Sequence, residues 1–481
     1  MTQRMSCPPA PVPLEDYATQ FDHLFENVAQ RRGFRTYLEG LLLPRDRNKT
    51  LTALVGAEPV VGAQAAAVQQ LQFFLSESTW DAEAVNDRRL ELLLSDKATR
   101  PHGGGVLVID DTGDRKDGSK TDHVARQYLG SVGKIDNGIV AVTSLWADER
   151  IYYPLHLQPY TPAGRLSMGK DDPAFRTKPQ IAAALVEEAL KAGLRFRAVV
   201  ADCFYGENVT FEQAIWTAKQ AYVLGLKPSK GVWAPADAVH TPEQAARQLH
   251  WDGPEAPGDW TNLVRHFRDG HEETWWAADL AFGHYGPDRP VRSVVATTDP
   301  STLPAMSTWY LTTDLPRPGS PQAAISPHPP ADLAEVVRLY GLRNWVEQSY
   351  KQVKNELGWA DFMVRADRAI RRHWQLVCCA FSFCWQAWFK EQETAMPSVQ
   401  ESKPALPPEV EARQAEAYPP TEDAEVGWGE NRRPQQNRKD RGPGGNGHLL
   451  AGDLTAGAKL AGALDLPLAL VAGMVELTPA S

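Results

Sequence analysis

Two short acidic motifs hold the side chains of this sequence that are best suited to chemistry. The first, VIDDTG, places Asp110 and Asp111 directly after a short apolar run, and the second, VVADCFYGEN, places Asp202 in the same way. Strand ends in an α/β sheet are where functional groups collect, because the sheet fixes the backbone and the loops give access. Paired carboxylates there can hold divalent cations, and Mg²⁺ prefers carboxylate oxygens to histidine or cysteine. Two such ions can activate a water or hydroxyl for displacement at a phosphodiester.

A third carboxylate is offered by a mixed-charge segment, YGLRNWVEQSYKQVKNELG at residues 340–358, whose periodicity predicts a helix. Four of its side chains would lie within roughly 60° of one another on the helix surface: Tyr340, Arg343, Glu347 and Lys354. One interpretation is a solvated face with i,i+4 ion pairs such as Arg343 with Glu347. The other is that Glu347 completes an acidic site with the two strand-end motifs. Eight Lys or Arg against four Asp or Glu at residues 338–372 make this neighbourhood basic.

The elements that must position these residues follow from hydrophobic periodicity. Residues 15–98 predict helices with basic residues between them, in RRGFR and PRDRNK; DNA docking and a plain helical cap both fit this module. A strand at Val106–Ile109 is expected to end at the aspartates, and further strands then alternate with helices, which predicts a mixed α/β sheet. The expected division of the chain is 1–99, helical and a candidate for DNA binding; 100–230, first part of the α/β core; 231–317, a Trp-rich β insertion; 318–392, second part of the core with the Glu347 helix; 393–447, a disordered linker; and 448–481, a C-terminal segment that can form a short helix.

Bulk properties exclude several classes of protein. The net charge of −10 argues against a nucleic-acid partner for the molecule as a whole, although a local basic surface can coexist with it. Five cysteines without a CxxC pair support neither a disulfide framework nor a zinc site. The N-terminus lacks the apolar core of a signal peptide, and HWQLVCCAFSFCWQAWF at residues 373–389 is interpreted as a buried core helix rather than a membrane span. We expect a cytoplasmic protein.

The order strand-Asp, strand-Asp, helix-Glu, with a β insertion before the Glu, resembles bacterial insertion-sequence transposases of the DDE type. More narrowly, the chain is similar to the group whose Glu helix carries Tyr-x2-Arg-x3-Glu-x6-Lys, a pattern present here from Tyr340 to Lys354. The resemblance covers residues 100–392, and the Glu helix is its most specific part. It implies an α/β fold: an RNase H-like mixed sheet flanked by helices and interrupted by a β-rich insertion, with an N-terminal helical domain and a disordered C-terminal linker.

The resemblance also implies roles for individual residues. Asp110, Asp202 and Glu347 would hold two Mg²⁺ ions, with Mn²⁺ as a substitute. DNA phosphates and backbone would be met by side chains of the Glu helix and of two other segments: Tyr340, Arg343, Lys351, Lys354, Arg126 and Trp309. Trp309 resembles the tryptophan that stacks on a flipped base in related transposases, but a place in the core of the insertion remains open for it. The Arg126 loop could equally be a solvated hairpin.

The first catalytic aspartate is ambiguous between two neighbours. The Asp-x-Thr pattern of many relatives favours Asp110, which is followed by Thr112, whereas a shift in register would favour Asp111. Adjacent residues of a strand point to opposite faces of the sheet, so only one of the two can face the site.

The function implied is metal-dependent DNA cleavage at the inverted-repeat ends of an insertion sequence, followed by strand transfer in cut-and-paste movement. A homodimer in a paired-end complex on DNA is expected, associated with the bacterial nucleoid and with no membrane. One alternative is a transposase-derived DNA-binding protein that no longer cleaves. The other is a metal-dependent phosphohydrolase built on VIDDTGD, which would need an acid where Thr112 stands.

Overall fold

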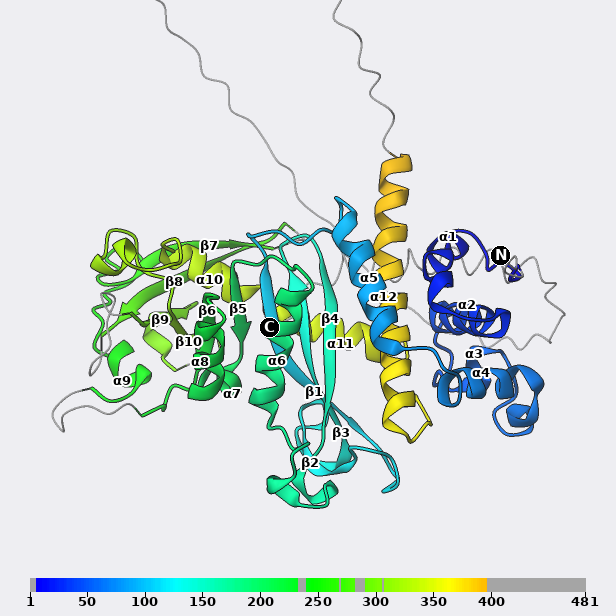
Figure 1. The fold of residues 1–481 in the computed structure, drawn as a ribbon. Coiled ribbons are helices and arrows are strands. Elements are labelled where there is room, and N and C mark those ends of the chain that lie inside the picture. The colour runs from blue at the N-terminus through cyan, green and yellow to red at the C-terminus, as the bar shows by residue number, and fades with distance from the viewer. Residues whose placement is uncertain (1–5, 232–238, 268–269, 282–289, 305–306, 396–481) are drawn as a thin grey trace, which may run out of the picture.

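The computed structural model describes residues 6–231, 239–267, 270–281, 290–304 and 307–395 of the chain (Figure 1). The linker and short helix predicted beyond residue 395 lie outside the described residues. Ten strands form one sheet in the order β2-β3-β1-β5-β6-β10-β9-β8-β7, with β4 paired to β3. The strands are β1 (Val106–Arg115), β2 (Ala125–Leu129), β3 (Lys134–Ala147), β4 (Tyr152–Tyr160), β5 (Ala198–Ala201), β6 (Tyr222–Leu226), β7 (Thr261–His266), β8 (Glu272–Leu280), β9 (Arg292–Thr297) and β10 (Thr308–Thr313).

Five of these strands form the core predicted from the sequence. They lie in the order β4-β3-β1-β5-β6, with β1 antiparallel to β3 and parallel to β5. Strands β5 and β6 are parallel, and the connection between them is helical, as the crossover of a parallel pair requires. This is the strand arrangement of an RNase H-like fold, and the predicted mixed α/β class is confirmed.

Strand β1 is longer than the sequence pattern predicted. It does not end at Ile109 but runs to Arg115, and each of its ten residues pairs with β3. The parallel partner β5 ends at Ala201, opposite Ile109. Asp110 is therefore paired with β3 in the middle of the strand. On its other edge it is the first residue of β1 beyond the end of β5, so that edge of β1 is open from Asp110 onward.

The Trp-rich insertion is β-rich, as predicted, and continues the same sheet. Strands β7 to β10 are antiparallel to one another, and β10 pairs with β6 of the core, Tyr310 standing opposite Leu226. A short helix, α9 (Pro242–Ala246), packs on β8 and β9. The hydrogen-bond ladder thus runs without interruption from the core into the insertion.

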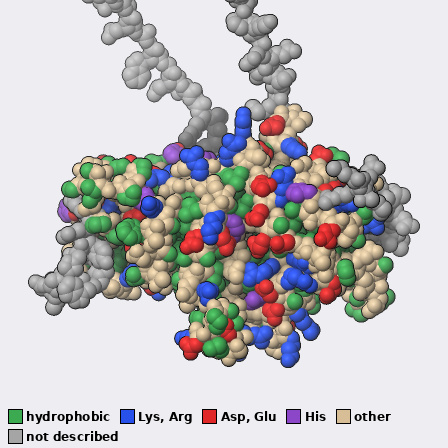
Figure 2. All heavy atoms as spheres, viewed as in Figure 1, with side chains coloured by type: hydrophobic (Ala, Val, Ile, Leu, Met, Phe, Trp, Pro, Cys, Tyr) green, Lys and Arg blue, Asp and Glu red, His purple; other side chains and the backbone are tan. Residues whose placement is uncertain are grey.

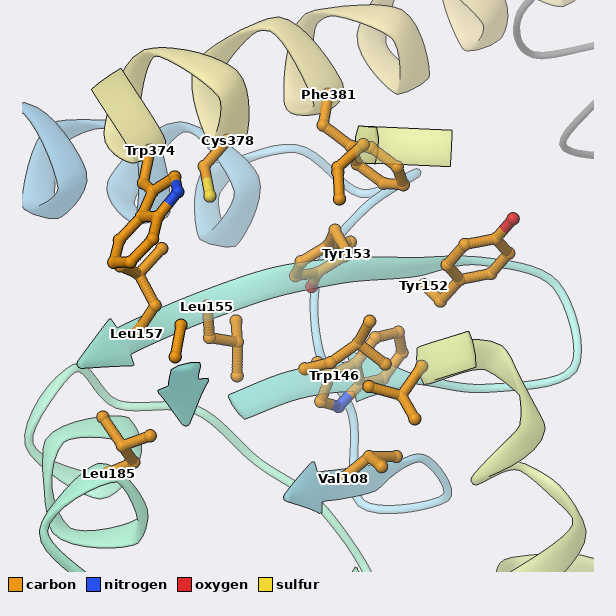
Figure 3. Packing of buried hydrophobic residues seen from close by; sticks show 14 of the residues in the cluster. Val108, Trp146, Tyr152, Tyr153, Leu155, Leu157, Leu185, Trp374, Cys378 and Phe381 are labelled. Atoms are coloured by element: carbon orange, nitrogen blue, oxygen red, sulfur yellow. The ribbon is translucent and has the colours of Figure 1, made fainter. Parts of the chain in front are cut away.

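Helices cover both faces of the sheet. Helix α6 (Lys178–Lys191) packs on β1, β3 and β4 and against α8 (Val209–Thr217); α7 (Cys203–Gly206) follows β5 directly. Helices α10 (Leu333–Gly341), α11 (Asn344–Asn355) and α12 (Asp367–Ala395) follow the insertion. Figure 3 shows Trp374, Cys378 and Phe381 of α12 directed at β4, with Leu185 of α6 on the other side of the strands.

The segment predicted to be a core helix is confirmed as part of α12. Trp374 and the cysteines Cys378, Cys379 and Cys384 are fully buried, and burial raises the pKa of all three thiols. They serve as packing atoms. No helix within the described ranges is long and apolar enough to cross a bilayer.

The N-terminal region is helical as predicted, but with different boundaries. The helices are α1 (Leu14–Ala18), η1 (Thr19–Leu24), α2 (Val28–Leu42), α3 (Leu51–Leu54), η2 (Val61–Gln64), α4 (Ala66–Ser76) and α5 (Ala82–Ser95). The prediction that RRGFR lies between helices is wrong, because it lies inside α2, where Arg31 and Arg35 are buried. The Arg35 guanidinium is neutralised by Glu15 at 2.8 Å and Asp22 at 2.7 Å. Arg35 thus ties α2 to α1 and η1, and neither arginine faces solvent.

Candidate active site

Three carboxylates come from three elements that the fold brings side by side. Asp110 lies on β1, Asp202 is the N-cap of α7 directly after β5, and Glu347 lies in the first turn of α11. The Asp202 carboxylate accepts the backbone N–H groups of Phe204 (3.0 Å) and Tyr205 (3.4 Å), as N-cap residues do. The chain turns at this point because β5 ends and an N-cap aspartate begins the next helix.

The helix predicted over residues 340–358 is interrupted. Helix α10 ends at Gly341 and α11 begins at Asn344. Across the break, the N–H of Arg343 donates to the Tyr340 carbonyl and that of Val346 to the Arg343 carbonyl, both at 3.0 Å. These are i→i−3 bonds of a tighter turn, placed beside Gly341, a weak helix former. The prediction of one continuous helix is therefore wrong: Tyr340 belongs to α10, whereas Glu347 and Lys354 belong to α11.

Arg343 connects two of the three carboxylates. Its guanidinium donates to Asp110 Oδ2 at 3.1 Å and lies 3.5 Å from Glu347 Oε1. The i,i+4 ion pair with Glu347 exists, but it is the longer of the two contacts, and the Glu347 side chain is 59% exposed. The Asp110 contact is shielded, with both side chains about 15% exposed. The interpretation of a solvated face therefore fits Glu347, which is exposed, but not Arg343, which is shielded and contacts Asp110.

The ionisation of Asp110 shows how much negative charge gathers here. Burial, and then the carboxylates of Asp202 and Asp111, raise the pKa of Asp110 to about 7, although the Arg343 guanidinium acts to lower it. One guanidinium thus does not balance the charges around Asp110. A site with this excess of buried negative charge is complementary to an added cation.

Asp111 faces the other side of the sheet. Its carboxylate accepts hydrogen bonds from Lys178 Nζ at 3.0 Å and from the Tyr205 hydroxyl at 3.1 Å. Adjacent strand residues point to opposite faces, so the structure places Asp110 with Arg343 and Asp111 with α6. Sequence reasoning overlooked both partners of Asp111. Tyr205 could have been found, since it lies in the DCFYG motif, whereas nothing in the sequence marked Lys178.

Tyr340 and Trp309 lie together beside Asp202. A Cβ added to Gly225 of β6 would be 2.7 Å from the Tyr340 hydroxyl and 3.2 Å from the backbone carbon of Asp202, so the hydroxyl rests over this glycine. The Trp309 ring meets the Tyr340 ring edge-on at 5.1 Å and the Trp275 ring at 4.4 Å. Trp309 is half-buried, so it packs in the insertion while lying next to the site.

The basic residues predicted to contact DNA differ in their exposure and in their distance from the carboxylates. Lys354 Nζ lies 2.7 Å from the buried carboxylate of Asp114 and donates to the Gly113 carbonyl at 3.1 Å. Lys351 is exposed on α11. Arg126 is exposed on β2, opposite Asn137 of β3, and so lies six residues along β3 from Thr143, the partner of Asp110. Lys354 therefore ties α11 to β1, and Arg126 lies apart from the carboxylates.

The donor atoms of the site suit a hard divalent cation. Asp110, Asp202 and Glu347 offer carboxylate oxygens, the donors that Mg²⁺ and Mn²⁺ prefer, and the raised pKa of Asp110 marks uncompensated charge. Within the described ranges, no three His, Cys, Asp or Glu side chains are already gathered closely enough to bind one ion together. The donor chemistry fits such ions, and exposed Glu347 is the member free to approach.

Comparison with known proteins bears on this geometry. A family model described as DDE superfamily endonuclease matches residues 20–278, a range that contains both aspartate motifs and ends before Glu347. A probable transposase for insertion sequence element IS701 from Microchaete diplosiphon is 35% identical over 350 residues, which is 73% of this chain and 81% of that protein. The chain therefore belongs to the DDE superfamily of endonucleases, among the transposases of insertion sequences.

Proposed function

We propose that this transposase cleaves DNA at the inverted-repeat ends of its element and joins the freed 3′-hydroxyl to target DNA. The observation that carries the proposal is that Arg343 contacts both Asp110 and Glu347 at the open side of β1, with Asp202 near enough to raise the pKa of Asp110. Metal-dependent phosphodiester chemistry needs carboxylates in this arrangement, and phosphohydrolysis on Asp110 would need an acid at Thr112. The transposase relative and the family match support the same reaction class.

The side chains of the site would divide between metal binding and DNA contact. Asp110, Asp202 and Glu347 would hold two Mg²⁺ or Mn²⁺ ions, which when bound supply an activated water and stabilise the leaving oxygen. Arg343, released from Asp110 by the incoming positive charge, would donate to a DNA phosphate. The hydroxyl of half-buried Tyr340, whose pKa burial raises to about 12, stays protonated and can donate a hydrogen bond to the DNA backbone.

Lys351 and Trp309 would extend the DNA contact on either side. Lys351 is the exposed cation of α11, and Trp309 presents a half-buried ring next to Tyr340. Binding to phosphates would come from the lysine, and stacking on an unpaired base from the tryptophan. Lys354 would not contact DNA directly; its ion pair with Asp114 would hold α11, and so Glu347, against β1.

A cleavage assay on DNA that contains the natural flanks of the gene tests the proposal. Asp202→Asn and Glu347→Gln should each abolish metal-dependent cuts at the element ends, whereas Glu356→Gln, an exposed change at the other end of α11, should leave them intact. Chelator should stop the wild type. Specific binding without cuts by the wild type would replace this proposal with the transposase-derived DNA-binding protein.

We further propose that two copies of the chain assemble on two element ends before cleavage. Analytical ultracentrifugation of the protein with DNA carrying one end, and with DNA carrying two, measures this directly. A complex of two chains with two ends is expected. Complete cleavage by a complex of one chain with one end would contradict it.

A further inference from the structure

The hairpin formed by β2 and β3 extends beyond the end of β1 and carries an exposed apolar surface. Tyr128 of β2 stands opposite Ile135 of β3 and both side chains are about 60% exposed, at 59% and 61%. Val132, in the turn between the strands, is 44% exposed. Strand alternation puts Arg126 on the same face as Tyr128 and Ile135. We call Tyr128, Val132 and Ile135 the hairpin wedge.

The charge around the hairpin wedge is opposite to that of the whole molecule. Residues 115–136 hold five Lys or Arg against three Asp or Glu, while the chain carries −10. The backbone N–H of Asn137 and the cations of Lys134, Arg115 and Arg126 lower the pKa of Asp136. Strand alternation puts Lys134 and Arg115 on the opposite face of the hairpin from the wedge and Arg126 on the same face, so cations flank the wedge on both faces. Figure 2 shows Lys and Arg gathered at the lower edge of this face, where Figure 1 places β2 and β3.

Apolar side chains set among cations match one kind of partner. A surface that binds another protein is typically apolar at its centre and poor in charged residues. Duplex DNA instead offers phosphates to the cations and base faces to the apolar tip. Proteins that distort DNA insert such apolar side chains between base steps, partly unstacking them. From Arg115, Arg126, Lys134 and the hairpin wedge we infer that the β2–β3 hairpin inserts into bound duplex DNA and unstacks one base step.

The sheet sets where on the DNA this would happen. Thr143 pairs with Asp110, and Ile135 lies eight residues earlier on the same strand β3. At about 3.4 Å per residue the wedge is at most about 27 Å from Asp110, which corresponds to about eight base pairs of duplex. The unstacked step should therefore lie within about eight base pairs of the phosphodiester held at the carboxylates. This location rests on the proposed function, but unstacking itself does not.

Fluorescence of 2-aminopurine, placed at successive positions up to ten base pairs from the element end, tests the inference. The full chain with Glu347→Gln binds DNA without cutting it, and its fluorescence should rise at one step. Adding Tyr128→Ala or Ile135→Ala should remove the rise and weaken binding about tenfold, as loss of one stacked base does. Tyr128→Phe should keep the rise. Ile325→Ala, a control at an isoleucine 74% exposed elsewhere, should also keep it.

The outcomes separate this inference from the proposed function. If fluorescence does not rise, or rises equally with Tyr128→Ala, the hairpin inference is overturned, whether or not the wild type cuts unlabelled DNA. A rise that depends on Tyr128 supports it even if the wild type fails to cut, in which case only the proposed function falls. If Tyr128→Ala instead turns dimers into monomers and leaves the fluorescence unchanged, the wedge is a protein interface.

Discussion

Replacing Asp110 by asparagine should change the pH dependence of stability in a way that the site geometry dictates. Burial and the nearby carboxylates raise the pKa of Asp110 in the folded protein from 3.8 to about 7. Between these two values the folded state binds a proton that the unfolded state has lost, so stability falls as pH rises through this window and levels off above pH 7. Asparagine does not titrate and removes this dependence.

The size of the effect follows from linkage. Each unit between the folded and unfolded pKa is worth about 1.4 kcal/mol. Between pH 5 and pH 8, the free energy of unfolding changes only over the interval from pH 5 to the folded pKa of about 7. The wild type should therefore lose about 2–3 kcal/mol of unfolding free energy over this range. Groups distant from Asp110 titrate alike in both proteins, so their contribution cancels when the free energy of unfolding of the variant is subtracted from that of the wild type.

Urea unfolding followed by tryptophan fluorescence, in chelator at intervals from pH 5 to pH 8, measures this difference. The free energy of unfolding of the wild type relative to Asp110→Asn should fall by about 2–3 kcal/mol over the range. Two curves that stay parallel would refute the reasoning, because Asp110 would then titrate normally. Adding Mg²⁺ at pH 8 should stabilise the wild type more than the variant, since a bound cation stabilises only the state that holds it.

Three further substitutions test other contacts. Gly225→Ala would place a Cβ 2.7 Å from the Tyr340 hydroxyl and 2.9 Å from the backbone nitrogen of Cys203, and cleavage should fall at least about tenfold because the ring or the backbone next to Asp202 must shift. Asp114→Asn removes the carboxylate 2.7 Å from Lys354; unfolding in urea should show a loss of about 1–3 kcal/mol, with weaker cleavage. Arg35→Ala leaves two carboxylates without their buried cation, and thermal melts should show a loss of about 3–5 kcal/mol.

Each substitution has its own control. Gly118→Ala adds a Cβ with nothing within 4 Å and should leave cleavage unchanged; equal losses at Gly118 and Gly225 would contradict the contact with Tyr340. Lys354→Met together with Asp114→Asn should lose less than the two single losses added together, because both changes break the same pair. Unchanged melting of Arg35→Ala would show that α2 does not depend on its ion pairs.

The strands of the core could be predicted from the sequence, because runs such as Val106–Ile109 and Ala198–Ala201 are apolar. The sequence pattern placed the end of β1 wrongly, since Asp110 to Arg115 carry no apolar pattern and are held as a strand by pairing with β3. Tertiary pairing overrides local preference at such positions. The interruption after Gly341 was also missed, because one glycine in a helical pattern is usually tolerated.

For the site, the residue types could be predicted but not their pairing. The spacing from Tyr340 to Lys354 indicated one face, and Arg343 and Lys354 do both turn toward β1, but the spacing did not show that their partners are Asp110 and Asp114. Contacts between residues more than 200 positions apart depend on packing that no local pattern encodes. Lys178, 67 positions from Asp111, shows that a shorter separation is no easier to predict, because only the structure brings the two together.

The uninterrupted ladder from β6 into β10 limits how the length of this chain can vary. Trp309 is held opposite Ala296 and its neighbour Tyr310 opposite Leu226, so inserting or deleting one residue inside β10 would turn Trp309 to the opposite face of the sheet. A residue added to a connection between strands changes no register and costs little. Peptide tags and natural length differences should therefore be tolerated between β7, β8, β9 and β10 but not within them.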